Sequence, residues 1–220
     1  MIRDSISRSP VANIEISSLP PDQTTKSILE FLETWFPIFR EEYVSMAVSL
    51  LEDDISRELN AFLQSKAKNY IFRFNEKKGV DFQILVEPYI LWAKPIFMIE
   101  AKRLPPTNPK DYVQGRTGGI ERFKREQEGF ILEKNHCAMV AYIQRHTFEH
   151  WLAQVNHWIT ELVANNESFE GVNWEESDKL VAIASNMSAI ARYTSNHSRK
   201  TLARLTVNHF WFDMRVDNSV

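Results

Sequence analysis

The chain has 220 residues, a net charge of −3 at pH 7 and a single cysteine, Cys137. This length favours one well-buried domain and is short for two. One cysteine excludes an internal disulfide and a cysteine-based zinc cluster. No apolar run reaches the roughly 18–20 residues that span a bilayer, and residues 1–21 lack the apolar segment of a secretory signal. We therefore expect a cytoplasmic protein without membrane contact, with a flexible N-terminal arm over 1–21.

The first half of the chain alternates between helical and strand patterns. Apolar residues at helical spacing predict a helix over 24–35, which Pro37 ends or restarts, and a longer helix over about 41–67. Strands are predicted over 69–74, 80–86 and 96–104, and the last begins with an apolar run that indicates burial on both faces. Prolines after residue 104 then break the chain before a glycine-containing loop over 115–119, which opens a helix to about 128.

The second half continues as a strand over 138–143 and a helix over 148–163. Segments 179–185 and 189–195 are predicted to be strands, with a helix as the alternative for the first of them. The last predicted strand spans 202–214. Helices and strands mixed in this order, without repeats, predict one α/β domain of the α+β kind over 22–220, with a central mixed β-sheet flanked by helices. Its core spans about 45–145, and a C-terminal helix and strands occupy 146–216.

Charge is distributed unevenly along this nearly neutral chain. Segment 22–60 carries nine acids against three bases, a balance of −6. Segment 100–125 carries seven bases against three acids, and segment 192–215 carries five bases against one acid, so each has a balance of +4. Such segments form a phosphate-binding surface if they fold onto one face, and ordinary solvated faces if they do not.

Three charged residues carry the chemical argument: Asp81 at the start of one predicted strand, and Glu100 and Lys102 on the next. Because strand side chains alternate, Glu100 and Lys102 share one face, and Asp81 meets Glu100 if the two strands pair antiparallel. Carboxylate oxygens are the ligands that Mg²⁺ selects, and the carbonyl of Ala101 offers one more. Lys102 would orient water or stabilise a phosphate. Alone, Glu-x-Lys is more often a surface ion pair.

These motifs resemble the PD-(D/E)XK nuclease superfamily, the restriction-endonuclease-like fold, over roughly residues 45–145. Asp81, Glu100 and Lys102 fall on its three signature positions, although Val80 stands where the name-giving proline would be. The segment Glu52-Asp53-Asp54-Ile55-Ser56 is similar to the acidic opening of the first core helix in many members. The resemblance implies Glu52 as a fourth catalytic acid, with Glu58 as the runner-up.

The resemblance implies a Mg²⁺- or Mn²⁺-dependent DNA endonuclease, such as a restriction or anti-phage defence effector. Its metal would be held by Asp81, Glu100 and Ala101. The segment over 112–123 also looks like a stretch in bacterial proteins with this core, which implies contacts with the DNA backbone from Arg116, Arg122, Lys124 and Arg125. The alternative for this segment is a mobile loop followed by a solvated helix face. A homodimer or a partner protein would suit double-strand cleavage. The alternative is an inactive module of the same fold that binds DNA or a protein.

A second polar pattern lies near the C-terminus. Ser195, His197 and Arg199 alternate, so we expect them on one face of a strand, while His209 lies in an apolar strand. These residues either contact the site or DNA, or are hydrogen-bonded within the core, and the second interpretation is favoured. The six histidines do not form a compact zinc ligand set, and Cys137 in a buried strand is expected to be inert.

Overall fold

The computed structural model describes residues 21–46, 51–75, 79–86, 93–108, 110–165, 171–185 and 187–215. Within these ranges the helices are α1 (Pro21–Ser45), α2 (Glu52–Lys66), α3 (Gly119–Arg125), α4 (Phe148–Asn165) and the short 3₁₀ helix η2 (Glu176–Asp178). The strands are β1 (Tyr70–Phe74), β2 (Phe82–Val86), β3 (Phe97–Leu104), β4 (His136–Ile143), β5 (Val181–Ala182), β6 (Ile190–His197) and β7 (Leu205–Asp213).

All seven of these strands form one mixed sheet in the order β1-β2-β3-β4-β7-β6-β5. β2 is antiparallel to β1 and to β3, whereas β3, β4 and β7 run parallel to one another. β6 is antiparallel to both β7 and β5. The central strands β3, β4 and β7 are buried almost throughout, as expected for parallel strands covered on both faces. The predicted α+β class with a central mixed sheet is confirmed.

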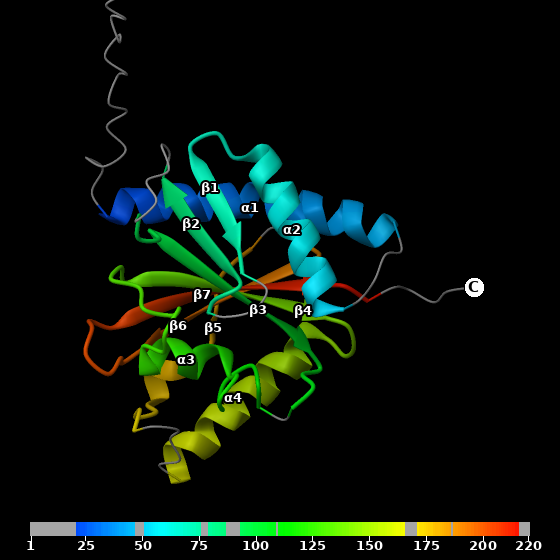
Figure 1. The fold of residues 1–220 in the computed structure, drawn as a ribbon. Coiled ribbons are helices and arrows are strands. Elements are labelled where there is room, and N and C mark those ends of the chain that lie inside the picture. The colour runs from blue at the N-terminus through cyan, green and yellow to red at the C-terminus, as the bar shows by residue number, and fades with distance from the viewer. Residues whose placement is uncertain are drawn as a thin grey trace, which may run out of the picture.

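Helices cover both faces of the sheet (Figure 1): α1 and α2 lie on one side, and α3 and α4 on the other. The buried apolar residues divide in the same way into two clusters. Ala101 belongs to the cluster on the α1–α2 side, whereas Met98 and Leu104 belong to the cluster on the α3–α4 side. Because strand side chains alternate, Glu100 and Lys102 share the face of Met98 and Leu104 and point toward α3.

The two N-terminal helices differ from the sequence prediction. α1 runs through Pro37 without ending, although a proline inside a helix removes a hydrogen bond and costs about 3 kcal/mol. Its neighbour Phe36 is fully buried and packs edge-on against Phe210 and Phe212, each with ring centroids 5.0 Å away, so tertiary packing holds the helix together. The single helix predicted over 41–67 was also wrong, because α1 ends at Ser45 and α2 begins at Glu52.

Most predicted strands are confirmed with shifted ends. β2 begins at Phe82, one residue after Asp81, and β7 begins at Leu205 rather than at 202. The helix predicted from Gly119 to about 128 ends at Arg125, and segment 179–185 contains only the two-residue strand β5. Residues 1–20 of the arm predicted over 1–21 lie outside the described residues, and Pro21 begins α1. Residues 76–78 and 87–92 also lie outside the described residues. In the described part of the chain, no helix is long and apolar enough to cross a membrane.

Candidate functional site

The candidate site lies where β2 separates from β3. The antiparallel pairing of these strands runs from Ile84 opposite Phe97 to Phe82 opposite Ile99, and it stops there. The following half of β3 therefore has backbone N–H groups that β2 does not reach. The carboxylate of Asp81 accepts the N–H of Ala101 at 2.7 Å, and that of Glu52, from the start of α2, accepts the N–H of Arg103 at 2.6 Å. The two acids thus replace the missing strand, through bonds strengthened by their charge.

Glu100 lies on β3 next to Ala101 and is only 1% exposed. One of its oxygens, Oε1, accepts from Lys102 Nζ at 2.9 Å and also from the guanidinium of Arg122, which comes from α3. The other oxygen, Oε2, is buried and makes no hydrogen bond to the protein. Lys102 Nζ also lies 3.7 Å from Glu52 Oε1. Three acids and two bases therefore converge on one point, from α2, β3, α3 and the residue that precedes β2.

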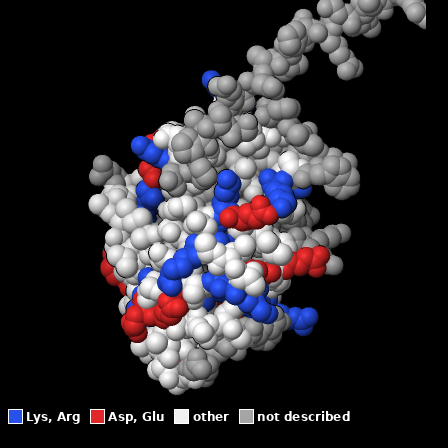
Figure 2. Space-filling view, turned by 90° about the vertical axis from the view of Figure 1, so that its left-hand side faces the viewer, with Lys and Arg blue, Asp and Glu red and all other residues white. Residues whose placement is uncertain are grey.

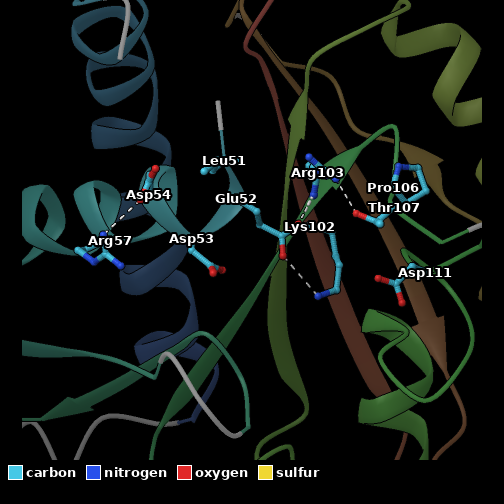
Figure 3. Close-up of a pocket in the computed structure, with 10 residues that line it drawn as sticks. All are labelled: Leu51, Glu52, Asp53, Asp54, Arg57, Lys102, Arg103, Pro106, Thr107 and Asp111. Atoms are coloured by element: carbon cyan, nitrogen blue, oxygen red, sulfur yellow. Dashed lines mark hydrogen bonds and ion pairs between the residues drawn. The ribbon is translucent and has the colours of Figure 1, made fainter. Parts of the chain in front are cut away.

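A cavity of about 380 Å³ opens beside this cluster (Figure 3). Glu52 and Lys102 point toward each other in its wall, and Asp53 projects from the same helix end as Glu52. The remaining lining residues are Leu51, Asp54, Arg57, Arg103, Pro106, Thr107 and Asp111. Glu58, the runner-up for the fourth acid, is exposed on α2 and does not line this cavity. Of the two candidates, the geometry favours Glu52.

Burial controls the electrostatics of the cluster. It raises the pKa of Asp81, against the lowering effects of Lys102 and of the Ala101 N–H. It raises the pKa of Glu52 in the same way, again opposed by Lys102. Burial lowers the pKa of Arg122 to about 10, although Asp81 and Glu52 both favour its charged form. Burial therefore works against the charged forms of Asp81, Glu52 and Arg122, and the opposite charges beside them work in favour of those forms.

A metal ion has suitable donors here, although they are not arranged as a ready-made site. In the described ranges, no three His, Cys, Asp or Glu side chains are grouped closely enough to hold an ion. Asp81 and Glu52 are each turned toward a backbone N–H of β3, and the accepting oxygen of Glu100 faces two cations. The unpartnered Oε2 of Glu100 is a buried carboxylate oxygen that a hard cation would satisfy.

The four predicted DNA-binding residues separate into different environments. Arg116 is exposed, and Arg122 contacts Glu100. The prediction for Lys124 was wrong, because its side chain is fully buried and its ammonium lies 2.8 Å from both oxygens of Asp178. Arg125 is also buried, and it donates to the carbonyls of Gly115 and Arg116. These two residues therefore do not present their charges to a backbone phosphate.

On the side that Figure 2 shows, the surface charge of the part of the chain that the structure describes does not form a positive patch that would bind a phosphate backbone. Lys and Arg side chains on that face are interspersed with Asp and Glu. Among the described residues, Arg204 binds Glu175 at 2.9 Å, and Lys94 binds Glu133. Oppositely charged neighbours of this kind reduce the field that would attract a polyanion. The balance of +4 counted along segment 192–215 is offset where its bases pair with acids from other segments, as Arg204 does with Glu175.

The C-terminal polar pattern forms a separate buried chain of hydrogen bonds. Ser195 Oγ lies 2.6 Å from His197 Nε2 and 2.7 Å from His209 Nε2. His197 Nδ1 lies 2.6 Å from Asp178 Oδ1, and His209 Nδ1 lies 2.7 Å from the hydroxyl of Tyr112. Both histidines are fully buried, which confirms the core interpretation. Arg199 does not share this face, because β6 ends at His197 and Arg199 binds the carbonyl of Leu132.

The donor and acceptor roles along this series of hydrogen bonds follow from the groups at its two ends. The carboxylate of Asp178 only accepts, so His197 Nδ1 donates to it, and the neutral ring accepts the proton of Ser195 at Nε2. Ser195 then accepts from His209 Nε2, and His209 Nδ1 accepts from Tyr112. The Trp211 indole N–H completes the chain by donating to Tyr112 at 2.9 Å. Burial lowers the pKa of both histidines, consistent with neutral rings.

Sequence reasoning missed two roles. The contact of Arg122 with Glu100 was not predicted, because the basic stretch containing Arg122 was interpreted as a DNA-binding helix face. Asp178 was not singled out, because it lies in a short acidic stretch typical of an exposed loop, and nothing local marks it as fully buried.

Comparison with protein-family models, curated proteins and solved structures finds no match to this chain. The functional interpretation therefore depends on the geometry of the site.

Proposed function

We propose that this chain is a Mg²⁺-dependent DNA endonuclease of the restriction-endonuclease-like type. The observation that carries the proposal is the convergence of Asp81, Glu100, Lys102 and Glu52 at the open half of β3, beside a cavity. The order of elements supports it: α2, the antiparallel strands β1 to β3, the basic helix α3, and β4 parallel to β3. This order agrees with the resemblance found in the sequence.

The residues present fit a hard divalent ion. Asp81 and Glu100 would hold it, with Glu52 and the carbonyl of Ala101 as further oxygen donors. When bound, Mg²⁺ supplies Lewis acidity toward a phosphate and lowers the pKa of a bound water. Lys102 keeps two ammonium protons beyond the one it gives to Glu100, and these can orient a water or a phosphate oxygen. DNA is the substrate we propose, in the setting of a restriction or anti-phage defence effector.

The experiment is cleavage of plasmid DNA with Mg²⁺ or Mn²⁺. Asp81→Asn and Glu52→Gln are suited to it, because each keeps an oxygen that can accept the β3 backbone N–H while the negative charge is removed. With Glu100→Gln and Lys102→Met, these variants should lose at least about 100-fold in rate, a typical cost of deleting one electrostatic contribution to catalysis. Glu149→Gln, an exposed change on α4, is the matched control.

Retention of wild-type cleavage by the folded Asp81, Glu100 and Lys102 variants would refute the proposal. Glu58→Gln separates the two candidates for the fourth acid, because Glu58 lies outside the cavity and its removal should leave the rate close to that of the wild type. Circular dichroism and thermal unfolding of each variant show whether the fold is kept.

A second candidate function is an inactive module of the same fold that binds DNA or a protein. The observation that favours it is that each acid already has a role without metal. Asp81 and Glu52 satisfy strand N–H groups, and Glu100 balances Lys102 and Arg122. Calorimetric titration with Mn²⁺ separates the two candidates, because the module predicts no heat that depends on Asp81, whereas the nuclease predicts binding that Asp81→Asn abolishes.

A further inference from the structure

We infer that Arg122 is an internal counter-ion that occupies Glu100 in the resting protein and moves to a substrate phosphate, so that metal and DNA bind cooperatively. This inference rests on the proposed function and concerns the regulation of the same site. Its starting point is that Arg122 and Lys102 both contact Oε1 of Glu100, the carboxylate best placed to hold a metal. A divalent ion bound at the unpartnered Oε2 would lie on the same carboxylate as the guanidinium, so the two positive charges repel each other.

The charge balance of the cluster supports competition. Lys102 and Arg122 already face the carboxylates of this cluster. A divalent ion added with both cations in place brings more positive charge beside them, in a site where burial makes excess charge expensive. The negative charge of a phosphodiester offsets that addition. Metal and phosphate are therefore accommodated best when they arrive together.

The surroundings of the Arg122 side chain allow its guanidinium to exchange one anionic partner for another. Its guanidinium stacks over the ring of Phe130 at 4.1 Å from the centroid, which supports its flat face while its edge faces Glu100. The side chain is 12% exposed, and its Nε is buried without a hydrogen bond. The same planar fork that binds a carboxylate also binds a phosphate. A movement of the side chain alone exchanges one anion for the other.

Lys102 does not replace Arg122 in this role. It lies on β3, two residues from Glu100 on the same strand face, and it also faces Glu52 at 3.7 Å, so it remains within the carboxylate cluster whichever anion is bound. Arg122 comes from a different element, α3, and its contacts with the cluster are made by the side chain only. Of the two cations, Arg122 is the one that can leave without disturbing the strand.

The experiment is Mn²⁺ titration by calorimetry, with and without a short DNA duplex whose linkages are phosphorothioates. The proteins are the wild type, Arg122→Gln, Arg122→Lys and the matched control Lys26→Gln, which removes one exposed charge on α1. Without DNA, Arg122→Gln should bind Mn²⁺ more tightly than the wild type, within the roughly 5- to 150-fold range of coupling between sites. Arg122→Lys should fall between the two, and Lys26→Gln should match the wild type.

The duplex provides the second readout. It should tighten Mn²⁺ binding in the wild type and have little effect in Arg122→Gln, because the counter-ion is already gone. Weaker or unchanged Mn²⁺ affinity in Arg122→Gln, or wild-type affinity that the duplex does not change, would overturn the inference. The wild-type comparison holds even if a variant does not fold. Mn²⁺ binding that Glu100→Gln leaves intact would instead refute the proposed function, so the two failures are distinguishable.

Discussion

The buried pair of Lys124 and Asp178 makes the sharpest prediction about stability. Both side chains are fully buried, and Lys124 Nζ lies 2.8 Å from each oxygen of Asp178. Asp178 also accepts from His197 Nδ1 and from the backbone N–H of Glu175 at 2.7 Å. Asp178→Asn keeps the size of the side chain but removes the charge, so the ammonium of Lys124 stays buried without its counter-ion.

The expected cost is about 3–5 kcal/mol, the usual penalty for removing one partner of a buried ion pair. That is a large part of the 5–15 kcal/mol by which ordinary domains are stable. At roughly 2–4 °C per kcal/mol for a chain of this size, the melting temperature should fall by about 6–20 °C. Urea unfolding followed by tryptophan fluorescence gives the free energy of unfolding, and Trp174, whose ring lies 4.7 Å from Lys124 Nζ, gives a local signal.

Glu176→Gln is the matched control, because it is the same carboxylate-to-amide change in the same short helix. Glu176 is 68% exposed and pairs with Lys179 at the surface, so its removal should cost less than about 1 kcal/mol. The double variant Lys124→Met with Asp178→Asn should lose less than the sum of the two single costs, because no unpaired charge remains. A cost below about 1 kcal/mol for Asp178→Asn, or strict additivity, would refute the reasoning.

Two further predictions concern pH and backbone packing. Burial lowers the pKa of His197 and His209 in the folded state, so the unfolded chain binds more protons than the folded one at low pH. The free energy of unfolding should therefore be at its full value above the ordinary histidine pKa of about 6.5 and decrease as the pH falls below it. Urea midpoints measured at each pH should show this decrease, and it should be smaller in His209→Gln. Gly129→Ala should destabilise more than Gly171→Ala, because both glycines have positive φ but only at Gly129 would a Cβ lie 2.5 Å from the backbone of Gly79; equal melting temperatures would contradict this.

The approach of Asp81 to the strand that carries Glu100 could be predicted because strand geometry leaves few alternatives. Side chains alternate with a period of two, so an antiparallel pairing of 80–86 with 96–104 fixes which residues share a face. The structure pairs Phe82 with Ile99, which brings Asp81 beside β3 at Ala101. The position of Glu52 required more than periodicity, since it depends on where α2 begins, and the apolar spacing over 41–67 contains no helix-ending residue.

The role of α3 could not be predicted for a different reason. Seven residues with three bases at the C-terminal end are typical of a solvated helix, because nothing in a short segment shows what will cover it. The structure instead covers it on two sides. Residues two positions apart point in nearly opposite directions on a helix, so Arg122 reaches Glu100 on β3 while Lys124 reaches Asp178 in η2. Neither of the long-range partners, Glu100 and Asp178, could be predicted from the local sequence pattern of α3.

This arrangement gives one helix two different electrostatic tasks. The ammonium of Lys124 is fixed by three contacts in a fully buried site, two with the oxygens of Asp178 and one with the ring of Trp174, so exchanging its partner would expose a bare charge to the core. Arg122 keeps a small exposed fraction, so its partner can change at lower cost. The rigid pair anchors α3, and the anchored helix then holds the movable cation within reach of Glu100. Loosening Lys124 should therefore weaken the control that Arg122 exerts on metal binding, before it affects the carboxylates themselves.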